Sequence, residues 1–124
     1  GVNKMMKFTI AQLKTAESAL VALSKEPLPA YISVRISKFL NAAGKELNDF
    51  EQQRNALVVK WGKENPEKGN SEVTEENMEA FKAEIEPILA KEVTFEWDKI
   101  RVSQLPPNLM LTPTQAAQLE PFLE

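Results

Sequence analysis

The sequence predicts a mainly helical fold with a small β element, an α+β class. Apolar residues recur at helical spacing over long segments and alternate with polar residues over short ones, and most of the 8 prolines and 4 glycines lie between these segments. We expect a helical hairpin with one long helix, a third helix packed on it, a two- or three-stranded antiparallel sheet and a short C-terminal helix. The 124 residues, 43% of them hydrophobic, suit a single domain over 1–124 that buries its own core.

The chain is expected to begin with a short strand followed directly by the first helix. Residues 6–8 alternate in polarity, which favours a strand. Thr9 and Gln12 match a capping box, in which two side chains satisfy free backbone N–H groups at a helix start. The first helix is therefore expected over about 10–25. Residues 1–4 are expected to be a disordered or expression-derived start.

The second helix carries the strongest pattern in the sequence and is expected over about 29–61. Two series of residues repeat every seven positions and define a narrow packing seam: Ile36, Ala43, Phe50 and Leu57, and Leu40, Leu47, Arg54 and Trp61. Such a helix spans about 48 Å, whereas a compact chain of this length has a radius of gyration of about 14 Å. The helix must therefore bend, near Gly44, or project and be covered. Gly62 is expected as a left-handed cap at its end.

A polar loop and a third helix are predicted next. The loop covers 62–73, and its turn signals leave room for a short hairpin. The third helix is expected over about 75–91, with Thr74 as its N-cap and glutamates in its first turn. Pro87 lies inside this helix and is expected to kink it or loosen its final turn.

The last third of the chain is predicted to hold the remaining strands and a short helix. Apolar and polar residues alternate over 93–102, which predicts a half-buried strand and a second one that includes Ile100 and Val102. Thr112 precedes a second capping-box pattern with proline at the first helical position. The short C-terminal helix is therefore expected over about 113–122.

Composition excludes several classes of function. The chain has no cysteine and no histidine, which removes disulfides, thiol nucleophiles, Ser-His triads and histidine metal ligands. The 4 glycines are too scattered for a phosphate-binding loop. The longest uncharged stretch, 102–119, contains three prolines and cannot be a membrane helix. We therefore predict no catalytic, cofactor-binding or metal-binding residues, no small-molecule substrate and no cofactor: the chain is not expected to be an enzyme.

The richest cluster of carboxylates is the first place to look for a metal-binding site. Four of them recur at spacings of three and four residues: Glu72, Glu75, Glu76 and Glu79. They lack the spacing of a Ca²⁺-binding loop, so a solvated helix start is the preferred interpretation. A second group, Glu92, Glu96 and Asp98, is interpreted as the wet face of a strand. An enzyme using carboxylate-bound Mg²⁺, Mn²⁺ or Ca²⁺ remains the last alternative.

The charges are unevenly distributed along the chain. Residues 1–60 carry 9 Lys/Arg and 5 Asp/Glu, whereas residues 61–124 carry 6 and 13. We expect the basic half to pack beside the acidic half. A nucleic-acid site would need the basic residues on one face with aromatic side chains between them, and the only candidates for that role are Phe8, Tyr31 and Phe39. Nucleic acid is therefore not the expected partner.

The seam of the long helix supplies the candidate interface residues: Leu40, Leu47, Phe50, Arg54, Leu57 and Trp61. Arg54 stands where leucine would pack best. It either pairs with a carboxylate such as Glu79 or Glu84 and sets the register of an interface, or packs its stem while its head reaches water. Trp61 and Trp97 are expected to be buried, with exposed interface anchors as the alternative.

A resemblance covers nearly the whole chain. Its elements follow in order: the segments 54–57 and 60–62, a polar turn, 73–77, Phe81 and 92–93, and the closing segments 111–112 and 119–122. This order resembles small phage- and prophage-encoded proteins of unknown function. The resemblance implies a phage context, located in the cytoplasm of a bacterial host or in the virion, and it implies no known activity and no functional residues.

The function expected from the sequence is protein–protein interaction without catalysis, with particle assembly as one setting. The simplest cover for a helix this long is a second copy in a homodimer, and another phage or host protein is the other candidate partner. Two alternatives remain: a regulatory or inhibitory protein that binds a host protein through its acidic half, and a nucleic-acid binder that uses its basic half.

Overall fold

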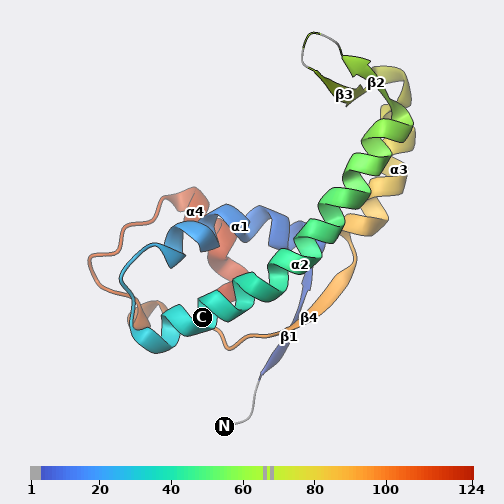
Figure 1. Ribbon diagram of the computed structural model, residues 1–124. Coiled ribbons are helices and arrows are strands. Elements are labelled where there is room, and N and C mark those ends of the chain that lie inside the picture. The colour runs from blue at the N-terminus through green and yellow to red at the C-terminus, as the bar shows by residue number, and fades with distance from the viewer. Residues whose placement is uncertain (1–3, 66, 68) are drawn as a thin grey trace.

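The computed structural model describes residues 4–65, 67 and 69–124 and divides into a body and a projecting arm (Figure 1). The predicted class, mainly α with a small β element, is confirmed. We call residues 51–91 the arm and the remaining described residues the body. The body holds β1 (Met5–Thr9), α1 (Ile10–Ser24), the first part of α2 (Ala30–Trp61), β4 (Glu92–Glu96) and α4 (Pro113–Leu119). The arm holds the rest of α2, β2 (Gly62–Asn65), β3 (Asn70–Val73) and α3 (Met78–Leu89).

Both predicted capping boxes are present. The Thr9 hydroxyl accepts from the Gln12 N–H at 3.1 Å, and the Thr9 N–H donates to the Gln12 amide oxygen at 2.8 Å. Thr112 and Gln115 make the same pair of bonds at 3.1 and 3.0 Å. These local contacts explain why α1 and α4 begin where the sequence predicts.

The body encloses an aromatic core under a two-stranded sheet. β1 and β4 pair antiparallel, and the side chains of Phe8 and Phe95 point inward with Trp97. Phe39 of α2 lies 5.0 Å from the Phe95 ring and 5.1 Å from the Trp97 ring, measured between centroids. Phe122 stacks on Phe8 at 4.7 Å. Aromatic pairs at such spacings add to the free energy of burial, so this cluster ties the sheet, α2 and the C-terminus together.

The predicted second strand over Ile100 and Val102 does not form. Ile100 makes an isolated parallel bridge to Leu123, its N–H donating to the Phe122 carbonyl at 3.1 Å, and residues Val102–Gln104 form a 3₁₀ turn. Ile100 thus pairs with the C-terminal residues and not with β4. The short C-terminal helix ends as α4 at Leu119 and continues as a 3₁₀ turn over Glu120–Phe122.

The long helix projects, as one of the two alternatives predicted. α2 is continuous from Ala30 to Trp61, and Gly44 does not interrupt it. Its second half leaves the body and is accompanied by α3, with the β2–β3 hairpin at the tip (Figure 1). The predicted polar loop over 62–73 is therefore this hairpin. No helix among the described residues has both the length and the apolar character needed to cross a membrane.

Two predicted caps on the arm are wrong. Gly62 is extended (φ −100°, ψ 175°) and opens β2. A glycine is needed there because an added Cβ would lie 2.6 Å from the Glu72 carbonyl oxygen and still closer to that of Val58. The Thr74 side chain makes no capping bond, and its buried Oγ1 has no hydrogen-bond partner among the described residues. The third helix consequently starts as a 3₁₀ turn over Glu75–Asn77 and ends at Leu89, two residues after Pro87.

The expected start over 1–4 lies outside the described residues except for Lys4. The Lys4 ammonium lies 3.2 Å from the Asp98 carboxylate, and the Arg35 guanidinium donates to the Asp98 carbonyl at 3.0 Å. Both contacts join the basic first half of the chain to the acidic second half, in the arrangement that the charge distribution favours.

Candidate functional site

The arm is thin, and little of it is buried. Twenty of the residues that the structure describes form the buried hydrophobic core, and in the described part of the arm only Ile85 belongs to it. The other large apolar side chains there are partly covered. Because the arm consists of two helices side by side with a hairpin at the tip (Figure 1), each helix is covered on one side alone.

The structure divides the predicted interface residues into two groups. Leu47 and Phe50 are 6% and 3% exposed and belong to the core of the body. Leu40, Leu57 and Trp61 are half-buried and remain within reach of a partner. The centre of the seam is therefore filled by the chain itself, and a contact to a second molecule through α2 would use the residues on either side of that centre.

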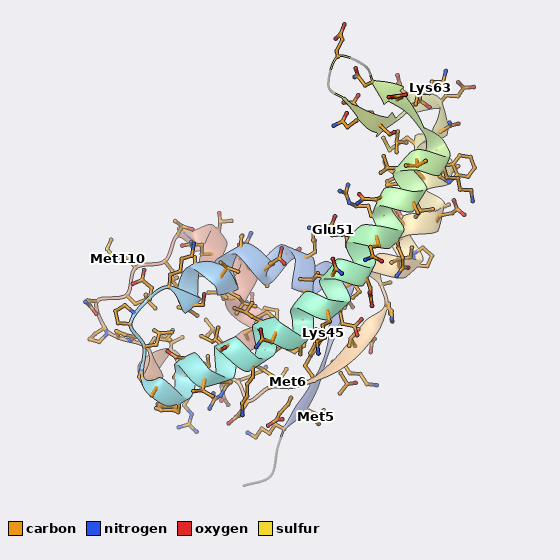
Figure 2. The ribbon with its side chains drawn as sticks, in the orientation of Figure 1. Met5, Met6, Lys45, Glu51, Lys63 and Met110 are labelled. Carbon is orange, nitrogen blue, oxygen red and sulfur yellow. The ribbon has the colours of Figure 1, made fainter. Side chains whose placement is uncertain are left out.

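Arg54 pairs within its own helix. Of the two alternatives, pairing with Glu79 or Glu84 does not occur, and the 43% exposed side chain fits an arginine whose stem packs while its head reaches water. The Arg54 Nε lies 3.2 Å from Glu51 Oε2, and the Lys14 ammonium of α1 lies 2.6 Å from Glu51 Oε1. The hydrogen bond from Lys14, aided by that from Arg54, holds the pKa of Glu51 below its ordinary value. These three side chains bridge α1 and α2 where the arm leaves the body, and Figure 2 labels Glu51 at this junction.

The Glu84 carboxylate is engaged by the end of α2. The Lys60 ammonium donates to Glu84 Oε1 at 2.8 Å, and the Trp61 indole N–H donates to Glu84 Oε2. The Lys60 bond, followed by the Trp61 bond, lowers the pKa of Glu84. Asn77 donates to the Trp61 carbonyl at 2.9 Å. This cluster joins α2, the 3₁₀ turn over Glu75–Asn77 and α3. Trp61 is half-buried within it, whereas Trp97 is 1% exposed and buried as expected.

Sequence reasoning missed the most exposed apolar residue of the arm. Val59 is 69% exposed on α2, between the half-buried Val58 and the Lys60–Glu84 contact. It lies outside both heptad series, so the seam pattern gave no reason to select it. Met78 and Phe81 of α3 are half-buried as well, and together these side chains give the arm an apolar character along its length.

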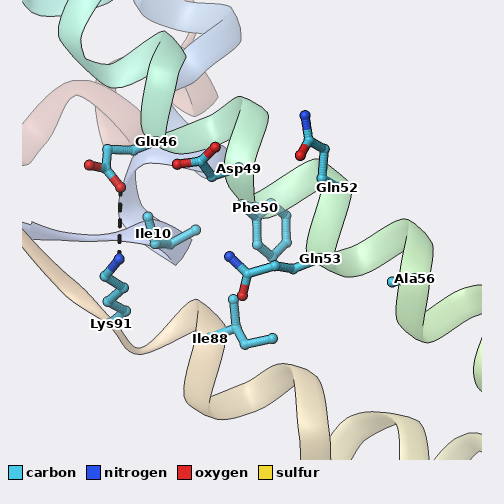
Figure 3. A pocket seen from close by; sticks show the side chains of 9 residues that line it. All are labelled: Ile10, Glu46, Asp49, Phe50, Gln52, Gln53, Ala56, Ile88 and Lys91. Carbon is cyan, nitrogen blue, oxygen red and sulfur yellow. Dashed lines mark ion pairs between the residues drawn. The ribbon is translucent and has the colours of Figure 1, made fainter.

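A crevice of about 330 Å³ opens where the arm meets the body (Figure 3). Ile10, Phe50 and Ile88 form its apolar part, and the Lys91 ammonium stands 3.9 Å from Glu46 across it. The remaining side chains are mostly polar: Asp49, Gln52 and Gln53, with Ala56. Such a lining suits a protein side chain that carries both apolar and hydrogen-bonding groups, and the crevice is contiguous with the arm.

The described residues give little support to the alternatives of metal binding and nucleic-acid binding. In residues 4–65, 67 and 69–124, no group of three or more acidic side chains could hold a metal ion. The glutamates predicted as a solvated helix start are all exposed and come from β3, the 3₁₀ turn and α3: Glu72, Glu75, Glu76 and Glu79. Of the three aromatic residues considered for nucleic acid, Phe8 and Phe39 are buried and Tyr31 is 53% exposed.

Comparison with known proteins adds no assignment. No protein-family model matches the chain, and no significant similarity to a curated protein or to a solved structure was found.

Proposed function

We propose that the chain acts without catalysis, by binding another protein through its arm. The observation that carries the proposal is the surplus of exposed surface. The molecule exposes 8333 Å², whereas a compact monomer of 13.9 kDa is expected to expose about 6,700 Å². The surplus of about 1,600 Å² is roughly twice what one partner buries in an interface of standard size.

We attribute this surplus to the arm, because its two helices project from the body and only Ile85 among its described residues is buried. Half-covered apolar side chains of this kind are typical of protein-binding surfaces. The acidic excess of the arm lies outside α2: residues 51–61 carry 2 Lys/Arg and 1 Asp/Glu, whereas residues 62–91 carry 4 and 8. A different protein that binds the hairpin and α3 would therefore need a basic surface. Binding of such a partner is expected to weaken with salt.

A second copy of the chain is the simplest partner. Val59 is turned by about 200° from Leu57 and Trp61 on α2, so it lies on the side of the helix away from the Trp61–Glu84 contact and is 69% exposed. A homodimer through α2 would bring two such exposed sides together. Light scattering after size exclusion, at about 0.15 M and about 1 M salt, measures this directly. A dimer that persists at the higher concentration supports α2-mediated self-assembly, and a monomer under both conditions leaves the arm for a different protein.

The phage or prophage setting of this proposal, with particle assembly as one role, is supported by the sequence resemblance alone. The same holds for a location in the host cytoplasm or the virion. A regulatory protein that binds a host protein through its acidic half would use the same arm, since the arm carries most of the acidic excess.

The test compares two substitutions on the same helix. Val59→Lys places a charge on the arm, and Val34→Lys places the same charge on an equally simple, 52% exposed valine of the body. Neither valine is buried, so both variants are expected to melt within a few degrees of the parent chain. We expect Val59→Lys to abolish self-association while Val34→Lys retains it. If the chain is a monomer, we expect Val59→Lys to abolish co-purification from phage-infected cells while Val102→Lys, at a 62% exposed valine in a 3₁₀ turn of the body, retains it.

Equal behaviour of the two variants would contradict the proposal. If both associate as the parent does, the arm is not the contact surface. If Val34→Lys alone loses association, the contact surface lies on the body.

A further inference from the structure

The sheet of the body has an open edge. In an antiparallel pair, residues alternate between those that bond the neighbouring strand and those that direct both backbone groups outward. The Trp97 N–H donates to the Lys4 carbonyl at 2.9 Å, and the Ile10 N–H donates to the Lys91 carbonyl at 3.0 Å. These bonds fix which residues of β4 face β1, namely those with odd numbers. The even-numbered residues therefore direct their N–H and C=O groups away from β1.

The outward residues of β4 are Glu92, Thr94 and Glu96. Among the described residues, no hydrogen bond joins the backbone groups of these three to another segment. Their side chains are exposed, whereas Phe95 between them is 6% exposed and faces the core. The edge of β4 is thus a short ladder of unused donors and acceptors, flanked by two carboxylates on the solvent side.

The opposite edge of the sheet is less open. In β1 the outward residues are Met5, Lys7 and Thr9, and the Thr9 N–H is already taken by the Gln12 side chain. The capping box that starts α1 therefore shortens this edge. β4 offers the longer unpaired ladder.

We propose that the outer edge of β4 binds an extended segment of a partner protein that carries a lysine or arginine opposite Thr94, with apolar residues on either side. The strand already paired with β4 shows the fit. Lys7 lies opposite Thr94, so Glu92 and Glu96 stand on its two diagonals, where opposite charges on neighbouring strands attract. In a strand added at the outer edge of β4, the residue opposite Thr94 would likewise lie diagonal to Glu92 and Glu96.

A second copy of β4 does not fit this edge. An antiparallel copy centred on Thr94 would place Glu92 opposite the Glu96 of its neighbour, and like charges directly opposite each other are destabilising. The charge pattern therefore disfavours self-pairing and favours a basic strand.

A groove beside β4 provides room for the apolar side chains of the added strand. Its volume is about 460 Å³, and it lies between the end of β4 and the first half of α2. Phe95 and Trp97 line it on one side, and Val34 and Ala42 line it on the other. Its charged lining consists of Lys4, Arg35, Lys38, Glu96 and Asp98, and both Lys4 and Arg35 are paired with Asp98. In strand addition, backbone bonds supply affinity and such grooves supply specificity. This surface is on the body, so the inference does not depend on the arm.

The experiment uses two peptides and two variants. The probe is acetyl-Thr-Val-Lys-Val-Thr-amide, and the matched control has glutamate in place of the lysine. Binding is followed by amide chemical shifts and hydrogen exchange of the full chain. We expect the lysine peptide to bind at least about tenfold more tightly and to slow exchange of the Glu92, Thr94 and Glu96 amides.

Thr94→Pro removes an outward N–H without removing a bond to β1, and proline is tolerated at such edge positions. We expect this variant to lose peptide binding, and Thr94→Val, which keeps the N–H, to retain it. Should Thr94→Pro fail to fold, the double variant Glu92→Lys, Glu96→Lys serves instead and is expected to prefer the glutamate peptide.

Three results would overturn the inference. The first is equal binding, or absence of binding, of the two peptides. The second is that the peptide slows hydrogen exchange at other residues and leaves the exchange of the Glu92, Thr94 and Glu96 amides unchanged. The third is protection of these amides in the free protein together with a dimeric mass, which would assign the edge to a second copy.

Discussion

Replacement by alanine should change the stability of the chain in opposite directions at Gly44, inside α2, and at Gly62, just after its end. Gly44 lies within the helix, and an added Cβ there has no atom within 4 Å. Glycine inside a helix costs roughly 0.5–1 kcal/mol relative to alanine, so Gly44→Ala should stabilise the chain by about that amount. At Gly62 the Cβ would lie 2.6 Å from the Glu72 carbonyl oxygen and close to that of Val58. Both obstacles are backbone atoms, so the hairpin must shift, and overpacking of this kind costs about 1–3 kcal/mol.

These free energies convert to measurable melting shifts. An unfolding entropy of about 2.1 cal/mol/K per residue gives about 0.26 kcal/mol/K for a chain of this length. Each kcal/mol therefore moves the melting temperature by about 4 °C. We expect Gly44→Ala to melt about 2–4 °C higher, and Gly62→Ala to melt about 4–12 °C lower if the arm unfolds with the body. If the arm unfolds first, the loss should instead appear as faster hydrogen exchange in β2 and β3.

The assay is thermal circular dichroism, with hydrogen exchange resolved by residue. Unchanged stability and unchanged hairpin exchange in Gly62→Ala would refute the close approach described above. A destabilised Gly44→Ala would show that the open side of this glycine is covered in solution, as it would be if a second helix packed against it.

Three further predictions address the core, a cap and the charges of the arm. Phe39→Ala, which removes the ring between Phe95 and Trp97, should cost about 3–5 kcal/mol and lower the melting temperature by about 12–20 °C; a loss under about 1 kcal/mol in denaturant titration would contradict the central role of this ring. Thr9→Ala should cost about 1 kcal/mol and speed exchange of the Gln12 amide, with Thr15→Ala, on the exposed face of α1, as the control. The pKa of Glu51 is lowered in the folded state, so its contribution is complete above the unfolded value of about 4.3 and is lost as pH falls through the lower native pKa. Glu51→Gln should remove part of the loss of stability seen on acidification, and an identical pH profile for the variant would show that Glu51 adds nothing.

The sequence predicts best those features that depend on neighbours along the chain. The two capping boxes and the continuous helix to Trp61 need only contacts within four residues, and the structure contains them. Ile100 failed as a strand residue because its partner is Leu123, far along the chain. Gly62 looked like a helix cap because a glycine after a helix usually is one, whereas it is required by the close approach of the Val58 carbonyl of α2 and the Glu72 carbonyl of β3.

The candidate interface was predicted in part for the same reason. The heptad series identified α2 as the helix with a packing seam but not the segments that fill it. The core of the body covers Leu47 and Phe50, and α3 accompanies the second half of the helix. The exposure of Val59 could not be predicted because it depends on the positions of α3 and the hairpin, which the residues next to Val59 in the sequence do not determine.

The continuity of α2 also fixes the direction in which the tip of the arm faces. Each residue of a helix advances it by about 1.5 Å and turns it by about 100°. One residue inserted between Phe50 and Leu57 would hardly lengthen the arm, yet it would rotate the hairpin to a different side of the molecule and detach it from α3. The residue count of this segment therefore sets the angle between the hairpin and the body, and the arm can change its reach only in whole turns matched by α3.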